Sequence, residues 1–237
     1  MLVDNKFIFL SIPRTASTSF HISCVRSNLD IKFANESYNN QYYDLSLSNV
    51  DLMESTGHPH EPIYDLTKQF GNKYNIIAIK RDRHQRFLSL WKFIIQRSKI
   101  YGDDIYEILK SLTINDILAF DLSNLNKIEI TNSIDLFLIK HNLVNKVDAY
   151  FKNLLFILWQ PTSMLHNNDS HIIWFDFNKL YELEEWVSNK LNKKFKLVNS
   201  NSSKELDLNL IIDNNFIETY NKIYDTFDLV KNKKTII

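Results

Sequence analysis

The sequence predicts an α/β fold in which a central parallel sheet is flanked by helices. Three short apolar runs, residues 6–12, 74–80 and 171–177, are typical of strands buried on both faces of a sheet. Each run is followed by a segment with apolar residues at helical spacing. Because strands that alternate with helices favour parallel pairing, we expect a parallel sheet with helices packed on it.

The elements of the first third of the chain follow from local composition. The run 6–12 ends at Pro13, and the residues after it indicate a tight loop and then a helix. Residues 30–56 are rich in Asn, Ser, Tyr and Asp with weak periodicity, so loops and short elements are expected there. A short helix is predicted around residues 61–70, before the second strand, 74–80.

The rest of the chain is mainly helical by the same criteria. Residues 87–94 follow the i, i+3, i+4, i+7 pattern of an amphipathic helix. Residues 104–143 are predicted to form several helical segments separated by breaks. The third strand, 171–177, is followed by apolar positions that predict a helix over 180–191, and a last helix is expected over 211–230.

Length and composition exclude several classes of protein. The 237 residues suffice for one domain with a sizeable core, and no Pro/Gly-rich linker divides them, so a single domain over residues 1–237 is expected. Lys plus Arg equals Asp plus Glu, at 28 each, which argues against a nucleic-acid or membrane-surface binder. No apolar run approaches the roughly 20 residues that span a bilayer. Without a signal-peptide pattern, we expect a cytoplasmic protein. The single cysteine, Cys24, is expected to be reduced and buried on a helix face.

The first candidate site lies between the first strand and the first helix, in the run Ile-Pro-Arg-Thr-Ala-Ser-Thr-Ser of residues 12–19. A helix N-terminus offers unpaired backbone N–H groups and the positive end of the helix dipole, and both stabilise an anion. Arg14 adds a positive charge with a forked set of donors. Four side chains add hydroxyl groups: Thr15, Ser17, Thr18 and Ser19. An ordinary Ser/Thr-rich helix cap is the alternative interpretation.

The second candidate site runs from Arg81 to Ser89. Arg81 follows a strand at its carboxyl end, which is where open α/β sheets bind ligands. Ser89 lies just inside the next predicted helix and off its apolar stripe, so it need not be a core residue. Arg81 and Ser89 could together hold a second phosphate. A solvated charge cluster at a helix start is the alternative.

These segments resemble the motifs of sulfotransferases that use 3′-phosphoadenosine 5′-phosphosulfate (PAPS), and most of all the Golgi-type carbohydrate sulfotransferases and their bacterial relatives. The Pro-Arg-Thr-Ala-Ser-Thr-Ser run of residues 13–19 is similar to their 5′-phosphosulfate loop, usually Pro-Lys-Thr-Gly/Ala-Ser/Thr-Thr/Ser. Residues 81–89 are similar to their Arg-Asp-Pro-x-x-Arg-x-x-Ser 3′-phosphate motif. Three later segments are similar to a Pro-Gln-Ser region, an Arg-Phe-Glu-Asn-Leu strand and a C-terminal Tyr-x-x-Asp-Phe-x-Leu region: residues 159–163, 174–180 and 199–229.

The resemblance implies a P-loop-like fold and assigns the donor-binding residues. Arg14, Thr15, Ala16, Ser17, Thr18 and Ser19 would hold the 5′-phosphosulfate, and Arg81 with Ser89 would hold the 3′-phosphate. Three positions depart from the family pattern: Arg14 replaces the usual Lys, Arg83 a Pro and Asp176 a Glu. The first departure bears most on activity, because Arg and Lys are not interchangeable at a tight site.

Two histidines, His58 and His60, lie in a Gly-His-Pro-His-Glu-Pro segment. Histidine suits proton transfer near neutral pH. In the relatives that this chain resembles, a histidine about twenty residues before the 3′-phosphate Arg is the general base, often in a His-x-Pro context. His60 fits that context better than His58. A metal site at the two histidines is the alternative, although no further ligand cluster supports it.

The expected function is therefore transfer of a sulfonate group from PAPS to an acceptor hydroxyl, with no metal required. The resemblance favours a carbohydrate acceptor over other small molecules. Two alternatives remain. A P-loop kinase is disfavoured because the Gly-x-x-x-x-Gly-Lys-Ser/Thr pattern is absent. A non-catalytic nucleotide- or glycan-binding module of the same fold is motivated by Arg14.

Overall fold

The computed structural model describes residues 1–35, 60–113, 116–117, 127–159, 163–166, 171–198, 214, 216–218 and 220–222. The chain divides into two compact units. The sheet unit comprises Met1–Asp82 and Thr162–Ser202, and the helical unit comprises Arg83–Pro161 and Ser203–Ile237. The single domain expected over residues 1–237 stays a prediction. None of the helices in the described ranges combines the length and the apolar character needed to cross a membrane.

In its described residues, the sheet unit contains the predicted strands and four helices. Its elements in chain order are β1 (Leu2–Val3), β2 (Phe7–Leu10), α1 (Ser17–Arg26), β3 (Ile31–Lys32), α4 (Ile63–Phe70), β4 (Asn75–Lys80), α10 (Ser163–His166), β5 (Ile172–Asp176), the 3-10 turn η3 (Phe177–Lys179) and α11 (Leu180–Leu191). The α/β class is thus confirmed, and the three predicted strands are β2, β4 and β5.

The sheet is mixed rather than wholly parallel, with the strand order β3-β1-β2-β4-β5 in the described residues. The parallel prediction holds for β2, β4 and β5, which pair in that order. Strand β1 runs antiparallel to both of its neighbours. For β1 and β2 the reason is a tight turn, in which Asp4 and Asn5 both have φ of 50° and the Lys6 N–H donates to the Val3 carbonyl at 2.9 Å.

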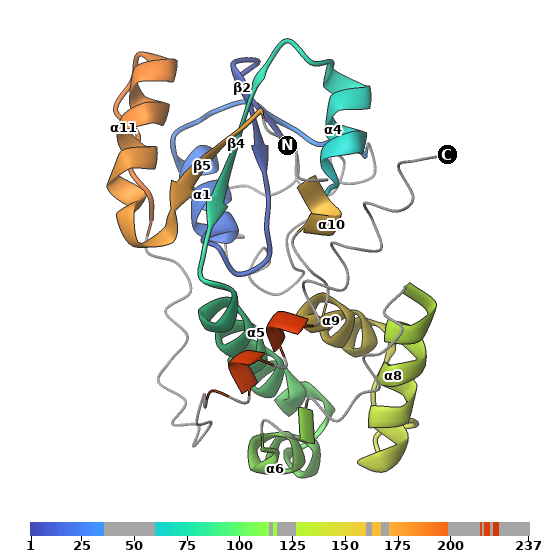
Figure 1. The fold of residues 1–237 in the computed structure, drawn as a ribbon. Coiled ribbons are helices and arrows are strands. Elements are labelled where there is room, and N and C mark those ends of the chain that lie inside the picture. Colours follow the sequence, from blue (N-terminus) through green and yellow to red (C-terminus); the bar gives the residue numbers. More distant parts are fainter. Residues whose placement is uncertain are drawn as a thin grey trace. The chain divides into compact units, whose positions relative to one another are not determined.

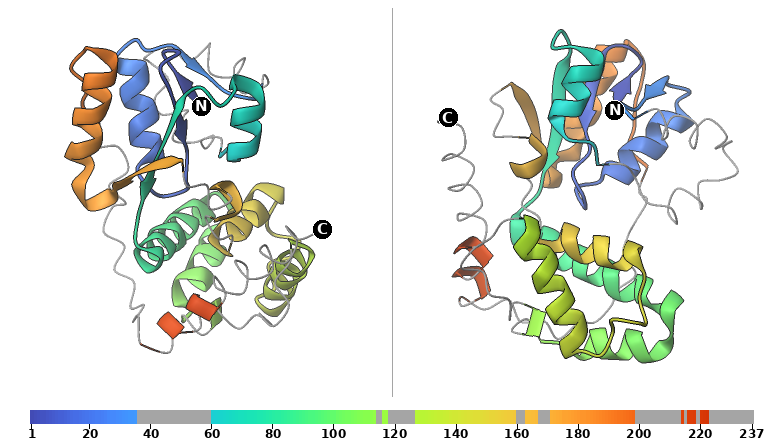
Figure 2. Two further views of the ribbon diagram at one scale, coloured as in Figure 1. Left: turned by 45° about the horizontal axis from the view of Figure 1, so that its top comes forward. Right: turned by 90° about the vertical axis from the view of Figure 1, so that its right-hand side faces the viewer.

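Helices cover both faces of this sheet (Figures 1 and 2). Phe7 and Phe9 of β2 belong to one apolar cluster, which includes residues of α1 and α11. Ile8 and Leu10 belong to a second cluster, which includes residues of α4 and α10. This alternation follows from the two-residue period of a strand. It also explains why β2 reads as a continuous apolar run, since both of its faces are buried.

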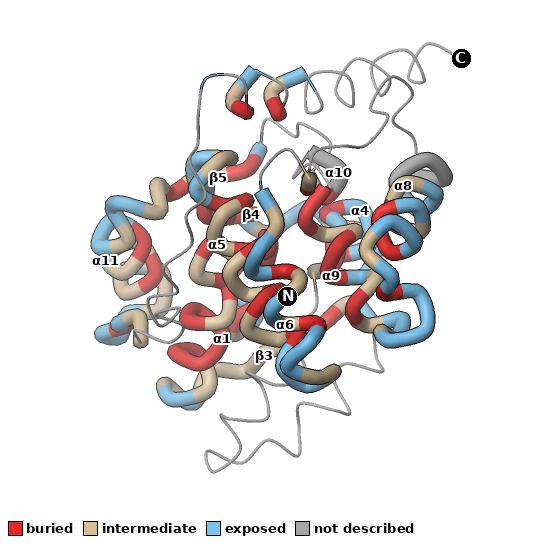
Figure 3. Tube along the Cα trace, turned by 90° about the horizontal axis from the view of Figure 1, so that it is seen from below, coloured by how far each residue is buried: buried red, intermediate tan, exposed pale blue. Residues whose placement is uncertain are grey.

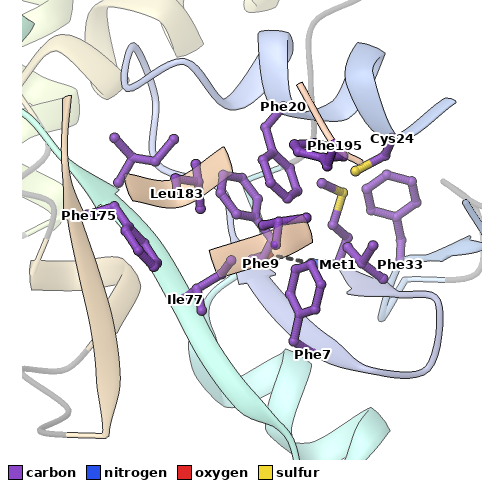
Figure 4. Packing of buried hydrophobic residues seen from close by; sticks show 13 residues of the cluster. Met1, Phe7, Phe9, Phe20, Cys24, Phe33, Ile77, Phe175, Leu183 and Phe195 are labelled. Atoms are coloured by element: carbon purple, nitrogen blue, oxygen red, sulfur yellow. Dashed lines mark hydrogen bonds between the residues drawn. The ribbon is translucent and has the colours of Figure 1, made fainter. Parts of the chain in front are cut away.

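The packing of α1 on β2 fixes the two ends of the loop between them. The Phe9 and Phe20 rings stack with centroids 3.9 Å apart and an interplanar angle of 9° (Figure 4). Both rings are fully buried, and burial of one such side chain contributes about 1.5–3 kcal/mol. Cys24, on the same helix, is buried in this cluster, as predicted. The loop at residues 11–16 is therefore held between two well-packed elements.

The helical unit contains α5 (Arg83–Ser98), the 3-10 turn η2 (Lys99–Tyr101), α6 (Asp103–Ser111), α8 (Lys127–Lys140) and α9 (Ala149–Trp159). The predicted apolar stripe of α5 is buried, and α6 and α8 each show one buried and one exposed side (Figure 3). Arg86 is also buried, and its Nη2 donates to the Ile157 carbonyl of α9 at 3.4 Å. Of the helix predicted over residues 211–230, the described positions 214, 216–218 and 220–222 are helical, and the others lie outside the described residues.

Candidate anion-binding site

The loop after β2 has an unusual backbone. Arg14 and Ala16 both have φ of 63°, in the left-handed region, whereas Thr15 between them has a negative φ. Non-glycine residues rarely adopt this region, and each such residue costs on the order of 1–3 kcal/mol. Alternation in the sign of φ turns successive N–H groups toward one side and forms a concave anion-binding arrangement, called a nest. The loop therefore has the backbone form of a phosphate-binding loop without its glycines.

The helix that follows adds to the positive potential. Helix α1 begins at Ser17 with Ala16 as its N-cap, and the Phe20 N–H donates to the Ala16 carbonyl at 2.9 Å. Its first turn contains no acidic residue. The N–H groups of a first helical turn have no carbonyl within the helix, and the positive end of the helix dipole lies there. An anion beside Ala16 and Ser17 would be stabilised by both.

The four predicted hydroxyl groups differ in their surroundings. Thr15 donates its Oγ1 hydroxyl to the Ile12 carbonyl at 2.9 Å, and so helps to hold the start of the loop. Thr15, Ser17 and Ser19 are buried, and Thr18 is half-buried. The structure thus brings all four to the start of α1, as the sequence predicts. The Thr15 hydroxyl is bonded to the backbone of the loop itself.

Arg81 reaches the loop from the neighbouring strand. It follows β4 directly, and its Nη1 donates to the Arg14 carbonyl at 3.1 Å. Its guanidinium carbon lies 4.3 Å from the centre of the Phe177 ring, a cation–π contact. The Nε atom of Arg81 is buried and has no hydrogen-bond partner in the structure described. A buried donor without a partner is costly, so an anion at this edge of the guanidinium would satisfy it.

The charges of the two arginines reinforce this expectation. Burial, and to a smaller extent the positive charge of Arg81, lowers the pKa of Arg14 to about 10. Burial also lowers the pKa of Arg81, against an opposing effect of the Asp82 carboxylate. Two guanidinium groups that are both partly removed from water repel one another, and an anion between or beside them would offset that repulsion.

His60 lies at the same end of β2. Its Nδ1 is 3.0 Å from the carbonyl oxygen of Ser11, the residue after β2. A carbonyl can only accept, so Nδ1 carries the proton and the basic lone pair is on Nε2. The next residue, Glu61, is buried, and its Oε1 accepts the N–H of Asn35 at 2.8 Å. These two bonds fix the backbone and ring of this segment against the sheet.

The structure therefore brings three of the predicted functional side chains to one end of the sheet unit. His60 contacts Ser11 and Arg81 contacts Arg14, three residues apart on one loop. Ser89 lies on α5 in the helical unit and is half-buried. His58 lies outside the described residues. Sequence reasoning did not assign a site role to Phe177, although its position at the end of the third predicted strand, 171–177, was a usable signal.

The residues fit an anionic ligand better than a metal ion. In the described ranges, no group of three or more His, Cys, Asp or Glu side chains is placed to hold a metal. The nest, the first turn of α1, the two arginines and the buried Nε of Arg81 all favour negative charge. The residues present thus fit an anionic group such as a phosphate. No protein-family model matches this chain, and neither does any curated protein or any solved structure.

Proposed function

We propose that this protein is a sulfotransferase that moves a sulfonate group from PAPS to a hydroxyl of an acceptor, and that its sheet unit is a P-loop-like fold. The observation that carries the proposal is the nest at residues 14–16, directly after a parallel strand and before a helix, with Arg81 of the neighbouring strand bound to it. Paired with the motif resemblance at residues 13–19 and 81–89, this geometry favours a donor with two separate phosphate groups.

Each residue of the site has a role in donor binding. The N–H groups of the nest and of the first turn of α1 hold the 5′-phosphosulfate, with Arg14 beside it. The Nε side of the Arg81 guanidinium holds the 3′-phosphate. A side chain that contacts the 3′-phosphate distinguishes PAPS from ATP-like nucleotides, which lack that group. Losing one such charge-assisted contact costs about 1.5–3 kcal/mol.

His60 is the proposed general base. Its Nε2 accepts the proton of the acceptor hydroxyl as the acceptor oxygen forms a bond to sulfur. The bond from sulfur to the 5′-phosphate oxygen breaks on the opposite side, and 3′-phosphoadenosine 5′-phosphate (PAP) leaves. Arg14 and the loop N–H groups stabilise the negative charge that develops on the departing phosphate oxygen. The resemblance favours a carbohydrate as the acceptor.

Thermal unfolding with added nucleotides tests the donor assignment. A ligand at 100 times its Kd stabilises a folded protein by about 2.7 kcal/mol, so PAP should raise the melting temperature while AMP and ATP at the same concentration raise it less. Equal shifts for all three, or no shift, would remove the PAPS assignment. PAP release from PAPS with a panel of carbohydrate acceptors then tests turnover. A PAP-specific shift without release would instead identify a non-catalytic binding module.

A matched arginine substitution separates the site from general charge effects. Arg14→Ala removes a guanidinium from the loop, whereas Arg26→Ala removes one from the exposed last residue of the same helix, α1. Both variants lose one positive charge. We expect PAP binding to weaken in Arg14→Ala only, because the positive end of the helix dipole and the nest lie at the Arg14 end.

A further inference from the structure

The Arg81 guanidinium holds the loop with one nitrogen and leaves another for a ligand. Nη1 donates to the Arg14 carbonyl, and the buried Nε has no partner among the described residues. A guanidinium presents five N–H donors in a rigid fork, so one side chain can serve two partners at once. Arg81 is therefore placed to affect the nest at residues 14–16 as well as an anion at its own Nε edge.

The contact with the Arg14 carbonyl has a directional consequence. The structure contains no cis peptide bond in its described residues. In a trans peptide unit the carbonyl oxygen of one residue and the N–H of the next point in opposite directions. When Arg81 binds the Arg14 oxygen, the Thr15 N–H must point away from Arg81. Because Thr15 lies between the two left-handed residues, its N–H is one of the donors of the nest.

Phe177 in turn restricts where Arg81 can lie. Strands β4 and β5 pair in parallel with Lys80 opposite Asp176, so the residue after each strand, Arg81 and Phe177, comes to the same edge of the sheet. The ring lies 4.3 Å from the guanidinium carbon. This contact limits the positions that the guanidinium can take while its Nη1 donates to the Arg14 carbonyl. Asp176 contributes by accepting the N–H of Asn178 at 2.8 Å, which holds the turn that carries Phe177.

We infer that Arg81 and Phe177 are positioning residues for the nest: Arg81 sets the direction of the Arg14–Thr15 peptide, and Phe177 holds Arg81 in place. The inference rests on the proposed function only for its nucleotide ligands. It gives Arg81 a role on the 5′ side of the donor as well as at the 3′-phosphate. Substitution of either residue should then lower the affinity even for ligands that lack a 3′-phosphate.

The first experiment needs no nucleotide. The amide resonance of Thr15 is recorded in two-dimensional proton–nitrogen NMR spectra of the wild type, Phe177→Leu and Arg81→Lys. Both variants should move the Thr15 resonance. Tyr74→Leu is the matched control, since Tyr74 also contacts a cation, Lys73 at 5.1 Å, but precedes the opposite end of β4. A Thr15 resonance that moves no more in Phe177→Leu and Arg81→Lys than in Tyr74→Leu overturns the inference.

The second experiment measures affinity for PAP and for adenosine 5′-phosphosulfate, which lacks the 3′-phosphate. Phe177→Leu should weaken both by about 2- to 5-fold, the value of a partly exposed cation–π contact, and Phe177→Tyr should restore both because it keeps the ring. A loss confined to PAP, or no loss for either ligand, overturns the inference. If the wild type binds neither nucleotide, the proposed function fails, and the Thr15 resonance still decides the inference.

Discussion

His21 makes the stability of the sheet unit depend on pH. The side chain is 2% exposed on α1, and its ring lies edge-on to Phe33 with centroids 5.5 Å apart. Burial lowers the pKa of His21 to about 3, whereas a histidine in an unfolded chain has a pKa of about 6.5. Below pH 6.5 the unfolded chain therefore binds a proton that the folded protein excludes. Folding stability is complete above pH 6.5 and falls as the pH drops toward 3.

The size of this effect follows from the difference between the two pKa values. Each pKa unit corresponds to about 1.4 kcal/mol, so His21 alone removes roughly 5 kcal/mol of stability between pH 6.5 and pH 3. That loss is comparable to the whole stability of a marginal domain, about 5–15 kcal/mol. Because α1 begins at the anion-binding loop, acid unfolding of this helix also destroys the site.

Urea unfolding at pH 7, 6, 5 and 4, followed by circular dichroism, measures the effect. His21→Leu removes the titrating group. Below pH 6, the free energy of unfolding should fall with decreasing pH less steeply in this variant than in the wild type, and the two slopes should differ by about 1.4 kcal/mol per pH unit. His171→Leu, at an exposed histidine of the same unit, is the control and should keep the wild-type slope. Identical slopes for wild type and His21→Leu would refute the reasoning.

Three further predictions concern the site. His60→Ala should lower sulfonate transfer by about 10²- to 10⁴-fold and keep the PAP-induced thermal shift, because the base contacts the acceptor and not the nucleotide; loss of the shift would contradict this role. Arg14→Lys should stay active and Arg14→Ala should lose most turnover, measured as PAP release; an unchanged rate in Arg14→Ala would reduce Arg14 to a surface charge. Ala16→Gly should fold with PAP affinity intact, whereas Ala16→Val should lower the free energy of unfolding by about 1–2 kcal/mol or more, because a branched side chain strains the left-handed backbone; equal stability of the two variants would count against the loop conformation.

The strands of the sheet unit could be predicted from sequence where burial leaves a clear pattern. The runs 6–12, 74–80 and 171–177 contain β2, β4 and β5, because a strand covered on both faces is apolar throughout. Strands β1 and β3 were missed because each has two residues and shows no periodicity. The antiparallel pairing of β1 with β2 depends on the turn at residues 4–5. A search for longer elements does not detect so local a feature.

The candidate site was predictable in its residues and not in its geometry. Residue types identified Arg14 and Arg81, since a cation next to the end of a buried strand is informative. His60 was selected by the resemblance, within its Gly-His-Pro-His-Glu-Pro segment. The left-handed conformations of Arg14 and Ala16 were not predictable, because neither residue favours them and the surrounding fold imposes them. The contact between Arg81 and Phe177 depends on strand register across 96 positions of chain, which no local pattern encodes.

The burial of Cys24 has a practical consequence. It is the single cysteine of the sequence, it is fully buried in the cluster between α1 and the sheet, and burial raises the pKa of its thiol well above the ordinary range. The thiolate is the form that attacks alkylating reagents, so the native protein should resist alkylation. Modification then requires that α1 separate from the strands behind it, and the rate of labelling reports how often that opening occurs. The labelling rate of Cys24 thus measures how often α1, the helix that begins at the anion-binding loop, separates from the sheet.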